Sequence, residues 1–150
     1  MQTGFNGKDT LLSMLAFILA LGVGCFFAPK DEYFFFNFIF FVFPAFFLFL
    51  LSFLRSKILF AGGILGFVLY LCLYKVLVAI SPAWGGDGWF VYLFGNFSGF
   101  VMLVICIGRF KKQFSHTFGI LAGALAFLVG SVLPIFVLSA FIFVLSAFLE

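Results

Sequence analysis

Few side chains in this sequence could perform catalysis, and their spacing matches no catalytic arrangement. His116 is the only histidine, and it stands between Ser115 and Thr117 at the end of a basic segment. Such flanking hydroxyls are typical of helix capping, whereas a nucleophile needs a base held beside it. Paired carboxylates, a phosphate-binding loop and the Cys or His spacing of a metal site are missing from the sequence. We therefore predict a protein that is not an enzyme and that binds no cofactor or metal.

Four other polar residues form a stronger candidate for a functional site. Lys75 is the only charged residue well inside an apolar run, and Asn37, Asn96 and Ser98 also interrupt such runs. An ionisable side chain in the middle of a membrane helix costs about 3 kcal/mol or more, so it usually has a function. Counted at about 1.5 Å per residue from the outer ends of their runs, all four lie at a similar depth. The sequence therefore predicts one polar layer around Lys75.

Two interpretations of this layer remain open. Lys75 lies close enough to the end of its run for its side chain to extend to the membrane surface or to pair with an acidic residue there. Asp31, Glu32 and Asp87 are the candidates for that pairing. Alternatively, the layer forms a shallow pocket that opens to the outer side of the membrane. Such a pocket would be positively charged and would favour an anionic or carbonyl-bearing group.

The segments that carry these residues are long and apolar. Of the 150 residues, 66% are hydrophobic and 9% are charged, and a water-soluble domain of this size could not bury so much apolar surface. The apolar runs reach about 20 residues, the length that crosses a membrane as a helix, and they do not alternate as barrel strands do. We predict an all-α, polytopic transmembrane helical bundle that forms a single domain (1–150). It has five to six membrane segments with very short connections, at about 11–28, 33–54, 58–80, 89–108, 117–132 and 134–149.

The last uncharged stretch is too long for one ordinary crossing. Residues 117–149 would form a helix of about 50 Å, whereas the hydrocarbon layer is about 30 Å thick. Pro134 lacks an amide hydrogen and is a natural position for a break. We predict a hairpin that turns near Pro134, which gives six segments and a cytoplasmic C-terminus. The alternative is one kinked helix whose end is covered by a partner.

Small residues predict where helices approach one another closely. In the last stretch, Gly119, Gly123, Ala126 and Gly130 lead to Pro134 along one helical stripe, and we assign these five residues to helix packing. The end of the chain repeats FVLSAFI as FVLSAFL, a seven-residue period that suits contact with another helix. The pattern leaves open whether that helix is internal or belongs to a second chain.

The second apolar run is unusually rich in phenylalanine. Of the 29 phenylalanines in the chain, many lie between residues 33 and 54, on all sides of the predicted helix. A helix that is aromatic all round has no polar side to present to a water-filled path. We therefore expect this helix to contact lipid or another hydrophobic protein, and we expect Pro44 to kink it.

Positive charge in the connections predicts the orientation. The gaps at residues 55–57 and 109–116 are basic and contain no acidic residue, whereas the gap at 81–88 contains only Asp87. Basic connections stay in the cytoplasm, which also places the N-terminus there. We predict a multi-pass protein of the cell membrane, most consistent with a bacterial inner membrane. These basic gaps are ordinary membrane anchors and do not indicate nucleic-acid binding.

These features favour a non-enzymatic membrane protein that acts through intramembrane helix contacts. Its partners would be the lipid bilayer and either another membrane protein or a second copy of the chain. A subunit of an envelope assembly fits this description, and so does a protein that binds a membrane-inserted protein. Colicin-type immunity proteins exemplify the second kind, although no motif of this chain matches theirs. The alternative is a small carrier or channel that passes an anionic or polar solute through the layer around Lys75.

Overall fold

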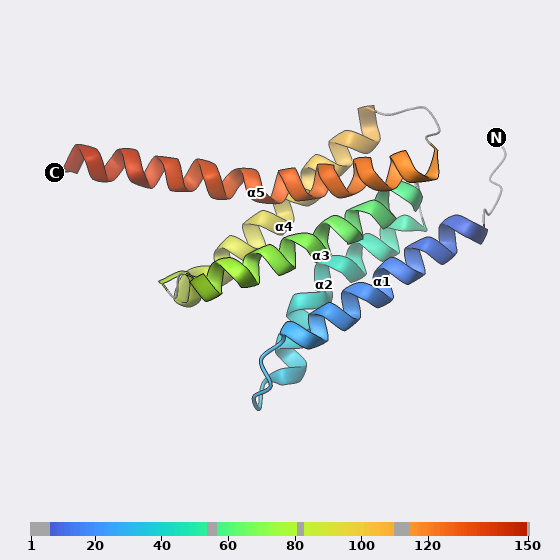
Figure 1. The fold of residues 1–150 in the computed structure, drawn as a ribbon, viewed down its shortest axis with the longest axis horizontal. Helices are drawn as coiled ribbons and strands as arrows, with labels where there is room; N and C mark the ends of the chain where they lie inside the picture. Colours follow the sequence, from blue (N-terminus) through green and yellow to red (C-terminus); the bar gives the residue numbers. More distant parts are fainter. Residues whose placement is uncertain (1–6, 54–56, 81–82, 110–114, 150) are drawn as a thin grey trace.

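Every regular element that the structure describes is an α-helix. The computed structural model describes residues 7–53, 57–80, 83–109 and 115–149. The helices are α1 (Gly7–Phe27), α2 (Phe34–Ser52), α3 (Lys57–Ile80), α4 (Ala83–Arg109) and α5 (His116–Leu149) (Figure 1). Each of these five contains a stretch that is long and apolar enough to cross a membrane. The predicted all-α, polytopic helical bundle is therefore confirmed.

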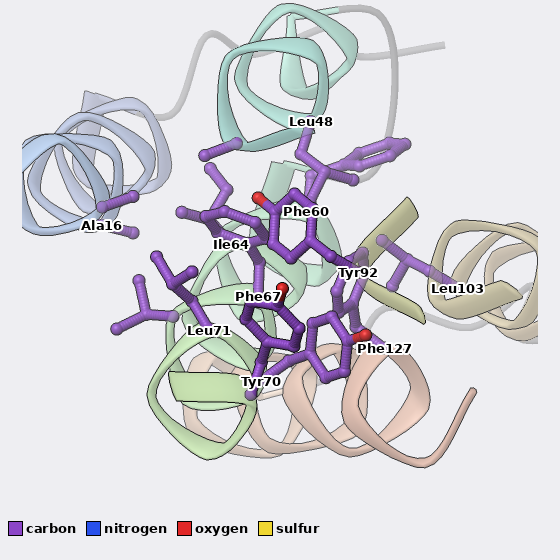
Figure 2. Packing of buried hydrophobic residues seen from close by; sticks show 14 residues of the cluster. Ala16, Leu48, Phe60, Ile64, Phe67, Tyr70, Leu71, Tyr92, Leu103 and Phe127 are labelled. Atoms are coloured by element: carbon purple, nitrogen blue, oxygen red, sulfur yellow. The ribbon is translucent and has the colours of Figure 1, made fainter. Parts of the chain in front are cut away.

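Helix α3 is the centre of the bundle and packs against each of the other four helices. Ile64 and Phe67 in its first half have no exposed surface. Figure 2 shows α3 enclosed by the other helices, with Leu48 of α2 and Phe127 of α5 on opposite sides of it. The core therefore lies around α3, while much of the surface of α1 and α2 is apolar and exposed to the membrane.

Glycines bring α5 into backbone contact with α3. A Cβ atom at Gly62 would overlap the backbone carbonyl of Ile120, and one at Gly123 would overlap that of Leu59. Gly66 repeats this arrangement one turn further along α3. Helices in lipid are held together largely by van der Waals contact, which is densest where no side chain separates the backbones. These glycines therefore account for the close packing of α3 on α5.

The contact between α4 and α5 is built in the same way. A Cβ atom at Gly99 would lie 2.8 Å from the carbonyl oxygen of Phe127, and one at Gly130 would lie 2.9 Å from that of Ser98. Of the five residues assigned to helix packing, Gly119, Gly123 and Gly130 are buried. The other two, Ala126 and Pro134, are half-buried. The small-residue stripe of α5 therefore faces α3 and α4.

The predicted hairpin at Pro134 is wrong, because α5 continues through this residue as one helix. The division into segments 117–132 and 134–149 is therefore replaced by a single helix of 34 residues. Pro134 removes one helical hydrogen bond, whereas a reversal of the chain in lipid would leave several backbone groups without partners. The C-terminal half of α5 extends past the ends of α3 and α4 (Figure 1).

The remaining helices lie close to their predicted segments. The largest difference is at the start of α4, which begins at Ala83 rather than at residue 89. The prediction began where the apolar run begins, but helical hydrogen bonds are made by the backbone and continue through polar residues at the membrane surface.

Candidate functional site

Tyr92 is the centre of a polar and aromatic cluster between α2, α3 and α4. Its side chain is fully buried, and its hydroxyl donates a hydrogen bond of 2.9 Å to the backbone carbonyl of Phe41 in α2. The Tyr92 ring packs edge-on against Phe41, with the ring centroids 5.4 Å apart. On the other side it packs against Tyr74 of α3 at 5.3 Å. One side chain of α4 therefore connects three helices.

The hydrogen bond from Tyr92 lies next to the proline of α2. Pro44 has no N–H group, so the carbonyl of Phe40 cannot accept its usual helical hydrogen bond. Phe41 is the next residue, and its carbonyl receives the Tyr92 hydroxyl. Groups of neighbouring helices commonly satisfy the backbone that a proline disturbs in a membrane helix. The Tyr92 hydroxyl thus adds a hydrogen bond to α2 next to the carbonyl that Pro44 leaves without its helical donor.

Tyr70 makes a similar contact between α3 and α4. Its hydroxyl donates a hydrogen bond of 2.9 Å to the backbone carbonyl of Val91. A Cβ atom at Gly95 would overlap this hydroxyl, so a glycine at that position leaves room for it. The rings of Tyr70 and Tyr92 are nearly parallel, with centroids 6.3 Å apart. Both hydroxyl donors are thus used in contacts between helices.

Lys75 is half-buried at the edge of this cluster. Its Nζ lies 4.4 Å from the centroid of the Phe41 ring, which is a cation–π contact. Among the described residues, this contact stands where the sequence allowed a pairing with an acidic residue. Asp31 instead accepts hydrogen bonds from the Asn37 side chain and from the Tyr33 amide. The side chain of Asp87, the third candidate, lies outside the described residues.

The structure does not bring the four residues of the predicted layer together. Lys75 joins the cluster through Phe41, and Asn96 joins it through a 2.8 Å hydrogen bond from Nδ2 to the Tyr92 carbonyl. Asn37 is half-buried near the N-terminal end of α2, where it hydrogen bonds to Asp31 at 3.3 Å. Ser98 is half-buried, and its backbone carbonyl lies against Gly130 of α5. Only Lys75 and Asn96 therefore belong to the site.

The polar layer predicted from the sequence did not include the tyrosines of this site. A signal of their real position was present in the spacing. Tyr70 and Tyr74 are four residues apart, as are Tyr92 and Asn96, so each pair lies on one face of its helix. Two such faces on neighbouring helices predict a shared cluster, although the spacing does not show which way each face points.

The chemistry available to this cluster is hydrogen bonding and cation–π attraction. In the part of the chain that the structure describes, no group of three His, Cys, Asp or Glu side chains could hold a metal ion. The Tyr70 and Tyr92 hydroxyls are committed to backbone carbonyls of other helices. The arrangement is therefore suited to holding α2, α3 and α4 together.

The fold and this site define the class of the molecule as a polytopic helical membrane protein. Comparison of the chain with protein-family models, with curated proteins and with solved structures gave no match. The function must therefore be inferred from the surfaces and contacts of the chain itself.

Proposed function

We propose that this chain is a non-enzymatic membrane protein that acts by binding another membrane-inserted protein through its apolar helix surfaces. A subunit of an envelope assembly and an immunity-type binder both fall within this function. The observation that carries the proposal is the face of α5. The same face that packs against α3 and α4 continues, exposed, beyond the bundle.

The continuation of this face follows from the seven-residue spacing of four residues. Gly123 and Gly130 are buried against α3 and α4. Val137 and Val144 follow at the same spacing and are 60% and 52% exposed. Positions seven residues apart on an α-helix differ in direction by only about 20°. The packing face of α5 therefore extends past the end of the bundle as an uncovered apolar strip.

The length of α5 supports the same conclusion. A helix of 34 residues measures about 51 Å, and the hydrocarbon layer is about 30 Å thick. One crossing of the hydrocarbon layer uses only about 20 of these residues. The remaining apolar turns need either a steep tilt or a second protein that covers them. Cover by an apolar partner also explains why this end carries no charge before Glu150.

Helix α2 offers a second apolar surface for a partner. Its outward-facing phenylalanines are large, rigid side chains, and the exposed members are Phe35, Phe36, Phe43, Phe46 and Phe47. Aromatic side chains dominate many protein interfaces because they bury a large area with few rotatable bonds. In a bilayer the same side chains also contact lipid. This surface supports the proposal but does not carry it.

The alternative function, a carrier or channel at the Lys75 layer, has less support. The Lys75 ammonium lies on the Phe41 ring, and the neighbouring Tyr70, Tyr74 and Tyr92 are buried. Side chains packed in this way provide contacts between helices rather than a path for a polar solute. We therefore expect Lys75→Met to leave the binding of a partner unchanged.

Affinity capture from membranes in a mild detergent tests the proposal. The double variant Val137→Ala/Val144→Ala removes apolar area from the exposed strip. Its matched control is Leu121→Ala/Leu125→Ala, which removes area from exposed side chains of α5 within the bundle. We expect a stoichiometric membrane protein to copurify with the wild type and the control and to be lost, at least tenfold, from the first variant.

Two results would contradict the proposal. One is that both double variants capture the same amount of the partner protein. The exposed strip would then make no specific contribution to binding the partner. The other is solute flux by the purified protein in liposomes that Lys75→Met abolishes. That result would favour the carrier instead.

A further inference from the structure

Two hydrogen-bond acceptors between α2 and α4 lack their usual donors. Asn96 is 6% exposed, and its Oδ1 is buried without a donor among the described residues. Its Nδ2 is bonded to the Tyr92 carbonyl, so Oδ1 lies on the opposite arm of the planar amide. In α2, the Phe40 carbonyl has lost its helical donor because residue 44 is proline. A buried acceptor such as Asn96 Oδ1 almost always has a partner.

The contacts between α2 and α4 place these two acceptors at the same depth. Tyr92 bonds to Phe41, and the rings of Phe100 and Phe47 lie 5.4 Å apart. Position 96 is midway between 92 and 100, and position 44 is midway between 41 and 47. Asn96 is therefore level with Pro44. The Phe40 carbonyl points along the helix axis toward residue 44, as each helical carbonyl points toward the fourth residue that follows it.

The orientation of α4 also turns Asn96 toward this region. Tyr92, Asn96 and Leu103 lie on one stripe of α4, at spacings of four and seven residues, and all three are buried. Tyr92 contacts α2 and α3, and Leu103 packs on Gly63 of α3. Asn96 lies between them and so faces the junction of α2 and α3 rather than lipid.

We propose that one water molecule binds between α2 and α4 and donates hydrogen bonds to Asn96 Oδ1 and to the Phe40 carbonyl. One molecule with two donors can satisfy two acceptors at one level. The Asn96 oxygen is enclosed, which favours water over any larger ligand. Buried waters typically make two to four such bonds, and ordered water commonly satisfies the backbone freed by a proline in a membrane helix. This inference is independent of the proposed function.

A double-mutant cycle in detergent tests whether the two acceptors share one donor. Asn96→Leu removes one acceptor, and Pro44→Ala gives the Phe40 carbonyl a helical donor. Either change alone leaves the water with one partner, whereas the double variant has no acceptor left to satisfy. The effects of the two single changes together predict an equilibrium constant of unfolding for the double variant. We expect the measured constant to be smaller than this predicted value by about threefold or more. The control cycle, Asn96→Leu with Gly22→Ala, should be additive because no neighbouring atom lies within 4 Å of the place that a methyl group at Gly22 would take. Additivity in the first cycle would overturn the proposal.

The wild-type protein provides a second test that needs no variant. A crystal structure grown in a lipidic mesophase should show water density within about 3 Å of both Asn96 Oδ1 and the Phe40 carbonyl oxygen. Density that contacts only one of the two oxygens would overturn the proposal. So would a side-chain donor, from this chain or from a second copy, that occupies the same position.

Discussion

Phe41 shows how one residue can hold three membrane helices together. Its carbonyl accepts the Tyr92 hydroxyl, and its ring receives the Lys75 ammonium group on α3. In lipid the hydrophobic effect does not drive helices toward each other, so polar contacts and close packing decide the arrangement. Phe41 combines a backbone contact with an aromatic one, next to the position where Pro44 interrupts the hydrogen bonds of α2.

We expect Tyr92→Phe to lower the free energy of unfolding by about 1 kcal/mol. The change removes the hydroxyl that satisfies the Phe41 carbonyl while it keeps the ring packing. The measurement is reversible unfolding with increasing SDS in mixed micelles. Tyr33→Phe is the matched control, because Tyr33 is exposed at the end of α2 and should tolerate the change. Equal effects at both positions would show that the Tyr92 hydrogen bond does not contribute to stability.

At the scale of the helices, two kinds of contact build the bundle. Helix α5 meets α3 and α4 through glycines, with backbone against backbone. Between α2 and α4, by contrast, long aromatic side chains such as Phe47, Phe100 and Tyr92 make the contact. Aromatic contacts are more tolerant of small shifts than glycine contacts, which permit no added atom. The α3–α5 contact should therefore be the most sensitive to substitution.

We expect Gly62→Ala to destabilise the protein by about 1–3 kcal/mol. The added methyl group would overlap the backbone of Ile120, which cannot move aside as a flexible side chain can. Gly22→Ala in α1 is the matched control, since no neighbouring atom lies within 4 Å of the place that its methyl group would take. Alanine is the better helix former, so the control should be neutral or slightly stabilising. SDS unfolding compares the two. A neutral Gly62→Ala would show that the helices are further apart than the structure indicates.

At the scale of the whole molecule, the number of crossings determines where the C-terminus lies. The basic gaps predict a cytoplasmic N-terminus. With five helices that each cross once, the same rule now places the C-terminus outside, not in the cytoplasm as the hairpin implied. The exposed strip of α5 would then be offered to a partner near the outer surface of the membrane.

Cysteine labelling in intact cells tests this orientation. In a variant that lacks Cys25, Cys72 and Cys106, we expect an impermeant reagent to label a cysteine at position 86 but not one at position 113. A tag added after Glu150 should be accessible from outside. An accessible position 113 would reverse the whole orientation. An inaccessible tag, with position 86 labelled, would instead show that the end of α5 does not cross as one helix.

The sequence by itself determined the class of this protein and most of its helix boundaries. Long uncharged runs can satisfy their backbone only within the segment, so each run must be a helix in lipid whatever its neighbours are. The small residues of α5, including Gly123 and Gly130, also indicated a packing face, because close approach requires the absence of a side chain.

Only the tertiary structure decided how α5 continues and which polar residues meet. Pro134 is compatible with a turn or with a continuous helix, and the structure shows the continuous helix, which keeps the backbone hydrogen bonded within the segment. The equal depths of Asn37, Lys75, Asn96 and Ser98 suggested one layer, but depth along a helix does not determine its rotation. The rotation of α4 turns Asn96 toward the cluster and leaves the Ser98 backbone against α5. Rotation depends on contacts among all the helices, and no single segment encodes it.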